Sequence, residues 1–319
     1  MAETGKDISR AAKLLVAGHL VAIPTETVYG LSANALNEQA VLKIFEVKNR
    51  PHFDPLIVHV HQKKAVNKYA VLEDARLIAL ADAFWPGPLT LLLPKKGNIS
   101  DLITSGLPQV AIRVPNHALT LELIKSINLP LAAPSANPFG YVSPTTPTHV
   151  EKQLGAKIPY ILDGGSCNIG LESTIVGIED NKVCIFRLGG LSLEAIEKVC
   201  GPVERRVNNS SNPKAPGQLQ SHYAPKKPLI IGDIEELVKK NISKKTAILC
   251  FGNKIYSHHK NVVIFNLSAR ADVEEAALNL FKYLRLADES EAELVICEKI
   301  PEHGLGRAIN DRLQRAATR

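Results

Sequence analysis

The sequence predicts an α/β fold in two units, a larger N-terminal one and a smaller C-terminal one. Short apolar strands alternate with helices as far as Val199, which is typical of a sheet covered by helices. The alternation stops at residues 204–221, a stretch rich in Asn, Ser, Pro and Gly with almost no apolar residue. It then resumes to the C-terminus. We therefore expect a catalytic domain at 1–205, a linker at 206–227 and a second domain at 228–319.

The elements of the first unit follow from apolar runs and their breaks. A helix is expected at 11–17 and a strand at 20–23, which Pro24 ends because its ring fixes φ and withholds an amide. The next helix, 38–47, places Val41, Ile44 and Phe45 on one face. Further strands are expected at 55–60, 90–94, 110–114, 129–133, 160–163, 174–178 and 183–188, and further helices at 72–83, 119–127 and 193–199.

The second unit reads as a small parallel doubly wound sheet. Its strands are expected at 229–231, 247–251, 262–265 and 294–297. A helix at 273–286 carries an apolar stripe, and a last helix at 307–317 follows the tripeptide GLG.

Composition favours a reduced, cytoplasmic protein. The five Cys residues are an odd number, widely spaced and without a CxxC pair, which argues against a disulfide or zinc framework. No apolar stretch is long enough to cross a membrane, and the first ten residues lack a signal core. The formal net charge of +6 is compatible with anionic substrates or RNA and does not distinguish them.

Familiar nucleotide and metal motifs are absent from the sequence. There is no Walker-type phosphate loop and no GxGxxG fingerprint after a strand. His59 and His61 share one face of a strand, but no third ligand stands at a telling spacing, so no protein metal site is expected.

Polar residues instead gather where apolar strands end, which is where open α/β sheets bind ligands. Arg113 interrupts the strand VAIRVP, and a buried guanidinium needs a carboxylate or phosphate partner. Taken singly, each Ser or Asn is explained by turn capping, and Lys48 and Arg50 by neutralisation of a helix end. The combination favours a binding site. Its members are Thr27, Lys48, Arg50, His59, Arg113, Ser135, Asn137, Ser143, Ser173 and Arg187.

At these residues the chain resembles the YrdC-like threonylcarbamoyl-AMP synthase family, in its two-domain form. The matching blocks are PTETVYGL, K-x-R-P followed by PLIVHV, FWPGPLT, AIRVP, APSANPFG, GLESTIV and FRLGG. APGQLQSHYAP in the linker and the final GLGRAINDRLQRA extend the likeness over nearly the whole chain. The resemblance implies a YrdC-like twisted mixed sheet with helices, followed by a smaller Rossmann-like parallel α/β domain.

The resemblance also implies a nucleotidyltransferase that joins L-threonine, bicarbonate (or carbon dioxide) and ATP into L-threonylcarbamoyl-AMP and pyrophosphate. Mg²⁺ would accompany ATP, and a separate threonylcarbamoyl transferase would use the product to modify tRNA, which this chain itself would contact weakly. The residues that match the threonine pocket are Thr27, His59, Arg113, Ala133 and Ser173. Those that match the ATP pocket are Lys48, Arg50, Asp54, Gln109, Ser135, Asn137, Ser143, Arg187, His222 and Tyr223, the last two from the linker.

Three positions depart from the family pattern. Gln109 stands where the family more often has Thr or a similar residue, and its contact is expected through the backbone. Asn49 replaces the usual Gly of the K-x-R-P step, and Asn tolerates left-handed backbone, so the turn is expected to survive. Asp54 replaces an Asn, and a carboxylate near phosphates repels them unless it binds Mg²⁺ or points away.

Two alternatives remain at this point. One is an RNA-binding module of the same fold without turnover, which would bind tRNA with a steep salt dependence. The other is a related carbamoyl-nucleotide enzyme for a different acceptor, although such enzymes usually carry acylphosphatase and zinc segments that this chain lacks.

Overall fold

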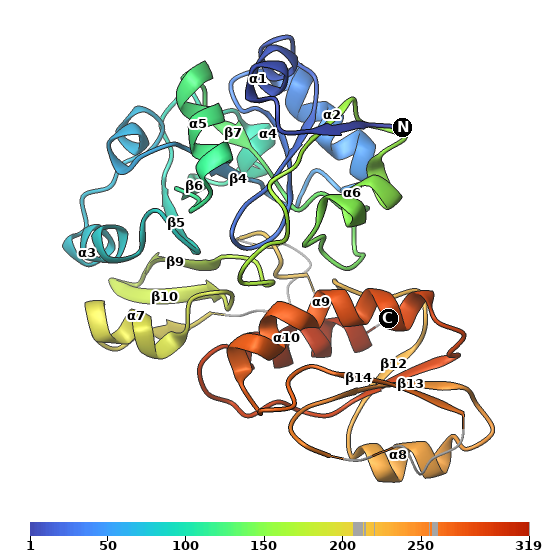
Figure 1. The fold of residues 1–319 in the computed structure, drawn as a ribbon. Helices are drawn as coiled ribbons and strands as arrows, with labels where there is room; N and C mark the ends of the chain where they lie inside the picture. Colours follow the sequence, from blue (N-terminus) through green and yellow to red (C-terminus); the bar gives the residue numbers. More distant parts are fainter. Residues whose placement is uncertain (207–212, 214, 220, 255, 257–260, 319) are drawn as a thin grey trace.

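The chain forms two sheets, one large and mixed, the other small and parallel (Figure 1). The computed structural model describes residues 1–206, 213, 215–219, 221–254, 256 and 261–318. The predicted linker, 206–227, therefore lies partly outside the described residues. The prediction of a mixed α/β domain followed by a smaller parallel one is confirmed.

The large sheet has eleven strands in the order β1-β8-β2-β3-β7-β4-β6-β5-β9-β10-β11. They are β1 Glu3–Gly5, β2 Val21–Ile23, β3 Gly30–Asn34, β4 Ile57–His59, β5 Leu89–Pro94, β6 Gln109–Arg113, β7 Leu131–Ala132, β8 Tyr160–Leu162, β9 Thr174–Glu179, β10 Lys182–Arg187 and β11 Glu204–Arg205.

The register of the central strands brings their polar ends to one edge. β4 and β6 are parallel and set His59 opposite Arg113. β5 runs antiparallel to β6 and sets Thr90 opposite Arg113. β9 lies parallel to β5, with Thr90 opposite Ile175. The carboxyl ends of β4 and β6 therefore meet the start of β9, and side chains there converge without a glycine-rich loop.

Helices cover this sheet and close its connections. They are α1 Ile8–Val16, α2 Glu38–Lys48, the 3₁₀ helix η1 Lys63–Lys68, α3 Ala75–Phe84, α4 Asp101–Thr104, α5 Ala118–Ile127, α6 Pro147–Leu154 and α7 Leu193–Cys200. The Asn37 side chain caps α2 by accepting a hydrogen bond from the Ala40 amide, 3.1 Å away. A left-handed residue, Asn49, ends the same helix.

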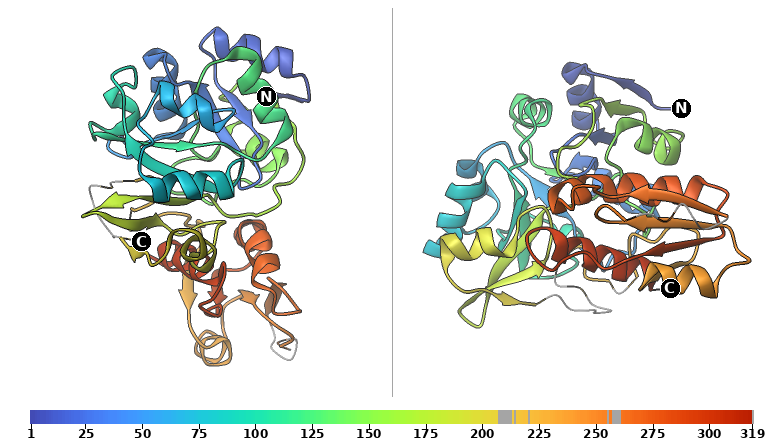
Figure 2. Two further views of the ribbon diagram at one scale, coloured as in Figure 1. Left: turned by 90° about the vertical axis from the view of Figure 1, so that its left-hand side faces the viewer. Right: turned by 60° about the horizontal axis from the view of Figure 1, so that its bottom comes forward.

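The C-terminal domain is a four-stranded parallel sheet in the order β12-β15-β13-β14. Its elements are β12 Leu229–Ile231, α8 Ile234–Lys240, β13 Thr246–Cys250, β14 Val262–Asn266, α9 Val273–Glu289, β15 Leu294–Cys297 and α10 Gly306–Ala317. α9 and α10 lie between this sheet and the N-terminal domain, whereas α8 lies on the far face (Figures 1 and 2). Within the described residues, no helix is long and apolar enough to cross a membrane.

Candidate active site

A narrow cavity of about 50 Å³ opens at the polar edge of the large sheet. It is lined by polar ends of the central strands, by the turn after β7 and by part of the linker. Nine of the residues predicted from the sequence line it: Arg50, His59, Arg113, Ala133, Ser135, Ser173, Arg187, His222 and Tyr223. Strands far apart in the sequence thus supply one site.

Arg113 provides a fork-shaped cation at the end of β6. Its side chain is buried, and one terminal nitrogen lies 2.7 Å from the Glu26 carboxylate, which is also buried. Its Nε donates to the Gly87 carbonyl at 3.3 Å. The carboxylate partner that the sequence demanded is therefore a residue of the loop between β2 and β3. A substrate carboxylate would share this guanidinium with Glu26.

His59 lies beside Arg113 and is uncharged. Burial, and then the positive charge of Arg113, lower the pKa of His59 from 6.5 to about 3. Its Nδ1 is buried and has no hydrogen-bond partner among the described residues. A neutral imidazole with a free nitrogen is suited to a hydroxyl or an uncharged amine of a ligand.

Lys48 crosses from the end of α2 to the turn after β7. Its Nζ donates to the carbonyl of Ser135, at 2.6 Å, and to that of Asn137. Burial lowers the pKa of Lys48 well below its usual value, and Arg50 adds to the effect. Since its bonds go to another segment, Lys48 does more than neutralise its own helix end.

Arg50 turns the other way, toward the loop that precedes β4. Its guanidinium lies 2.8 Å from Asp54 in a fully buried ion pair and donates to the carbonyls of Asp54 and Pro55. Burial raises the pKa of Asp54, while Arg50 opposes the rise. Asp54 therefore points at Arg50 and not into the cavity, which removes the repulsion that its position in the sequence suggested.

Arg187 closes the opposite wall. It donates from Nε and Nη2 to the Ser173 carbonyl, at 3.1 and 2.9 Å, and from Nη2 to the Ser173 hydroxyl at 3.0 Å. The same hydroxyl lies 2.7 Å from Thr90 Oγ1. Among the described residues, neither Arg187 nor Lys48 forms an ion pair with a carboxylate. Arg187 therefore has no carboxylate that neutralises its charge, whereas the lowered pKa of Lys48 disfavours its charged form until an anion is bound beside it.

The remaining predicted residues lie behind the lining or away from it. Thr27 is buried, and its hydroxyl is 2.8 Å from that of Thr25, which lines the cavity. Ser143 donates to the lining residue Glu172 at 2.5 Å. Asn137 donates to the carbonyls of Pro138 and Tyr141. Gln109 stands at the opposite end of β6 from Arg113 and does not line the cavity, because three residues of extended chain separate them.

The linker enters the site through His222 and Tyr223. The Tyr223 ring is buried, with its centroid 4.1 Å from that of His222 and 5.7 Å from that of Phe281 in α9. Burial and the nearby Arg50 and Lys48 lower the pKa of His222 well below its usual value. The cavity left beneath them has room for a few water molecules and not for a nucleotide. A ligand of that size requires this segment to move.

Three charged residues of the site were missed from the sequence. Glu26 pairs with Arg113, and Glu172 and Arg312 form a second buried ion pair, 3.0 Å apart. Glu26 and Glu172 stand inside two of the quoted blocks, PTETVYGL and GLESTIV, next to residues that were selected. Arg312 gave no such signal, because it looks like one more basic residue of a polar helix.

Buried polar atoms without a hydrogen bond gather around this cavity. They include His59 Nδ1, Asn137 Oδ1 and His222 Nδ1. Such atoms are rare in folded proteins and often mark the place of a ligand. In the part of the chain that the structure describes, no group of three His, Cys, Asp or Glu side chains could hold a metal ion.

Comparisons with known proteins agree along the whole chain. The family model for Sua5, YciO and YrdC, described as "Telomere recombination", matches residues 13–189, and "Threonylcarbamoyl-AMP synthase, C-terminal domain" matches 191–318. Threonylcarbamoyl-AMP synthase of Pyrococcus abyssi is 41% identical over 322 residues, 96% of this chain and 93% of that protein. Its Bacillus subtilis counterpart is 40% identical over 321 residues, with 97% and 92% covered. The crystal structure of P. abyssi Sua5 complexed with L-threonine has a TM-score of 0.91 at 39% identity, covering 99% of this chain and 97% of that one.

Proposed function

This chain belongs to the Sua5–YciO–YrdC family, and from that premise we propose that it is an L-threonylcarbamoyladenylate synthase. It joins L-threonine, bicarbonate or carbon dioxide and ATP, and releases pyrophosphate. In reaction terms it is a nucleotidyltransferase, because an adenylyl group passes from ATP to a carbamate.

One observation carries the proposal: a forked cation for a carboxylate and cations without carboxylate partners converge on a single cavity. Arg113 is the forked cation. The others are Arg187, which lines the cavity, and Lys48, which lies behind the lining and donates to the carbonyl of the lining residue Ser135. The first suits the carboxylate of an amino acid. The others suit the phosphates of ATP. Two relatives named threonylcarbamoyl-AMP synthase are about two-fifths identical to this chain over almost their whole length. Their name indicates which reaction such an arrangement serves.

The reaction needs positioning more than a protein nucleophile. The uncharged amine of threonine adds to carbon dioxide and loses a proton, which gives a carbamate. A carbamate oxygen attacks the α-phosphorus of ATP in line, and the bond to the pyrophosphate oxygen breaks. The neutral His59 beside Arg113 fits this step, because it offers the amine a hydrogen-bond partner without the negative charge that would hold it as an ammonium ion.

We assign the pocket residues as the family resemblance does. Thr27, His59, Arg113, Ala133 and Ser173 form the threonine side, and Lys48, Arg50, Ser135, Asn137, Ser143 and Arg187 form the ATP side. Gln109, at the far end of β6, has no support as an ATP contact from its position. Asp54 acts by pairing with Arg50, and Mg²⁺ arrives bound to the triphosphate of ATP.

The linker covers the reaction. We propose that His222 and Tyr223 shield the carbamate, which is labile in water, between a catalytic domain at 1–205 and the second domain at 228–319. The cavity is too small for ATP while they are in place, which supports a cover that opens and closes. The adenylate would then pass, in the cytoplasm, to a separate threonylcarbamoyl transferase acting on tRNA.

The test is pyrophosphate release from ATP and bicarbonate, with each common amino acid in turn. We expect release with threonine and little with the others. Arg113→Lys keeps a cation beside Glu26 but removes the fork, so KM for threonine should rise about tenfold or more while KM for ATP stays unchanged. Equal release with and without threonine, or tight tRNA binding without any turnover, contradicts the proposal.

A further inference from the structure

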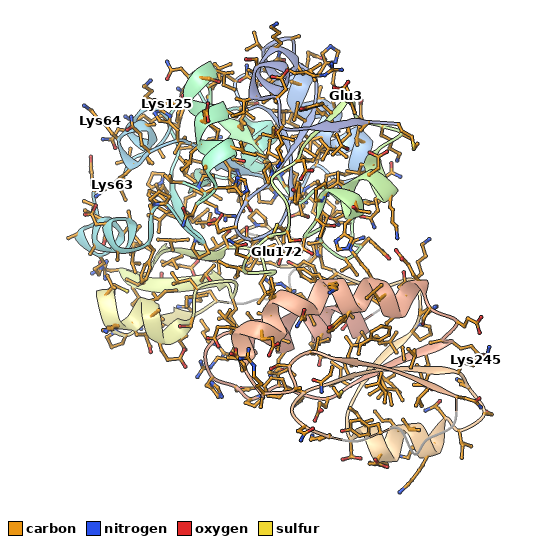
Figure 3. The ribbon with its side chains drawn as sticks, in the orientation of Figure 1. Glu3, Lys63, Lys64, Lys125, Glu172 and Lys245 are labelled. Atoms are coloured by element: carbon orange, nitrogen blue, oxygen red, sulfur yellow. The ribbon has the colours of Figure 1, made fainter. Side chains whose placement is uncertain are left out.

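One arginine of the C-terminal domain lies inside the catalytic half of the molecule. Arg312, in α10, is fully buried. Its Nε donates to Glu172 at 3.0 Å, Nη2 to the Leu188 carbonyl at 2.7 Å and Nη1 to Asp311 at 2.6 Å. Glu172 lies at the centre of the molecule, where α10 meets the large sheet, whereas Lys64 and Lys245 lie at its outer rim (Figure 3). A guanidinium thus crosses from one domain to the wall of the other's cavity.

A charge is an unusual means of packing α10 against that wall. The buried face of this helix is largely apolar, with Ile309, Leu313 and Ala316, apart from Arg312 and from Arg315, which pairs with Asp311 of the same helix. A leucine or methionine would serve docking as well, because a buried ion pair contributes little net stability over apolar residues of similar size. Domain docking alone therefore does not explain the buried ion pair between Arg312 and Glu172.

That partner stands between two residues of the proposed ATP side. Glu172 lines the cavity, accepts the Ser143 hydroxyl on Oε1 at 2.5 Å and gives Oε2 to Arg312. Arg187 donates to Ser173, the neighbour of Glu172 in the chain, yet no ion pair joins Arg187 and Glu172 among the described residues. Arg312 and Ser143 engage the two oxygens of Glu172, which leaves Arg187 without a carboxylate partner.

The other face of the same guanidinium supports the linker. The Arg312 Cζ atom lies 4.8 Å from the centroid of the Tyr223 ring, within the range of a cation–π contact. Phe281 of α9 packs on that ring as well. Residues of the second domain therefore form the surface against which Tyr223 of the proposed cover packs.

We infer that Arg312 is a positioning residue for the ATP side of the pocket. It holds the Glu172 carboxylate away from Arg187 and fixes the Ser143 hydroxyl through Glu172. It also supports the Tyr223 ring. The inference rests on the proposed synthase function and gives the C-terminal domain a part in it. Arg312 acts through other residues and touches no substrate itself.

The test compares Arg312→Met and Arg312→Lys with a matched control, Arg307→Met. Arg307 lies in the same helix and also bonds an acid of the first domain, Glu194 at 2.5 Å, but it does not approach the cavity. KM for ATP should rise about tenfold in Arg312→Met and less in Arg312→Lys, because a free Glu172 then competes for Arg187. KM for threonine should stay within about twofold, and Arg307→Met should match the unaltered chain in both.

A structural role alone would not split the two KM values. Adding Glu172→Gln to Arg312→Met removes the competing carboxylate, so part of the ATP affinity should return, as measured also by calorimetric titration of a non-hydrolysable ATP analogue without threonine. Equal ATP affinity in Arg312→Met, Arg312→Lys and Arg307→Met overturns the inference. If Arg312→Met does not fold, Arg312→Lys decides alone, because it keeps the charge. An unaltered chain without threonine-dependent turnover contradicts the synthase proposal instead.

Discussion

At the scale of single residues, the site contains three buried arginines, each of which forms an ion pair with a buried carboxylate. Glu26 holds Arg113, Asp54 holds Arg50 and Glu172 holds Arg312, each pair at 3.0 Å or less. Leaving one member of such a pair alone costs several kcal/mol, typically about 3–5. Conservative replacements such as Arg113→Lys are therefore the informative ones, because they separate binding from folding.

His59 makes a prediction about pH and stability. Its pKa is 6.5 when exposed and about 3 in the fold, so between these values the unfolded chain binds a proton that the native chain does not. Its contribution to the free energy of unfolding is full above the unfolded value and is lost as pH falls, by at most about 1.4 kcal/mol per pH unit. His59→Asn should lose less stability than the unaltered chain between about pH 7 and about pH 5.

Urea denaturation of both chains across this range measures the difference. His61, which is only partly buried and stands two residues away, provides the control, since His61→Asn should alter the slope far less. Parallel stability curves for His59→Asn and the unaltered chain would mean that the pKa of His59 is the same in the folded and the unfolded chain, which contradicts the prediction.

At the scale of elements, the turn after α2 sends two candidate phosphate-binding residues, Lys48 and Arg50, to different segments. Asn49 ends the helix with φ 53° and ψ 40°, and the Arg50 amide returns to the Phe45 carbonyl at 2.9 Å. Because of this left-handed residue, Lys48 reaches the turn after β7 while Arg50 reaches Asp54. The sequence-based expectation that Asn preserves the turn agrees with this conformation.

Asn49 therefore carries a stability prediction. Asn49→Ala should lower the free energy of unfolding by about 1 kcal/mol, because a Cβ without a polar group is strained in this region, and Asn49→Gly should be close to neutral. Asn128 is the control: it ends α5 in the same conformation, with φ 49°, and lies outside the lining of the cavity. Asn128→Ala should cost similar stability in denaturant titrations, but only Asn49→Ala should also raise KM for ATP. Equal KM values in both variants would separate the turn from the phosphate site.

The sequence predicted the strands and helices that have a local apolar pattern. It missed those that depend on pairing with segments distant along the chain. Apolar strands such as β5 and β6 were expected almost to the residue. β3, with the sequence GLSAN, has no apolar run and is a strand because β2 and β7 supply hydrogen bonds on either side. Charged residues at strand ends predicted Arg113 and Arg187, which line the cavity, but not that Arg312, from the last helix, would bond to the lining residue Glu172. Partners distant along the chain leave no local pattern.

At the scale of the whole molecule, the two sheets share one interior. A single cluster of buried apolar residues runs from Leu31 and Leu91 in the large sheet through Tyr223 to Phe281, Ala308 and Leu313. Polar bonds cross the same boundary, among them Tyr141 to Asp288 at 2.7 Å. Exposed pairs such as Lys152 with Glu289 add at most about 1 kcal/mol each. The apolar contact, and not the surface charge, should couple the domains.

This coupling predicts one unfolding transition. Trp85 is the only tryptophan, lies in the N-terminal domain and donates from Nε1 to Leu89 at 2.7 Å, so its fluorescence reports on that domain alone. Its denaturant midpoint should coincide with that of far-ultraviolet circular dichroism, which reports on both domains. Phe281→Ala leaves a cavity between the domains that costs about 3–5 kcal/mol, so it should separate the two curves, with dichroism falling first. Lys152→Ala should leave them together, because it removes only an exposed ion pair. Two midpoints in the unaltered chain would show that the domains unfold separately. The contact between Arg312 of α10 and the Tyr223 ring would then form without a shared core.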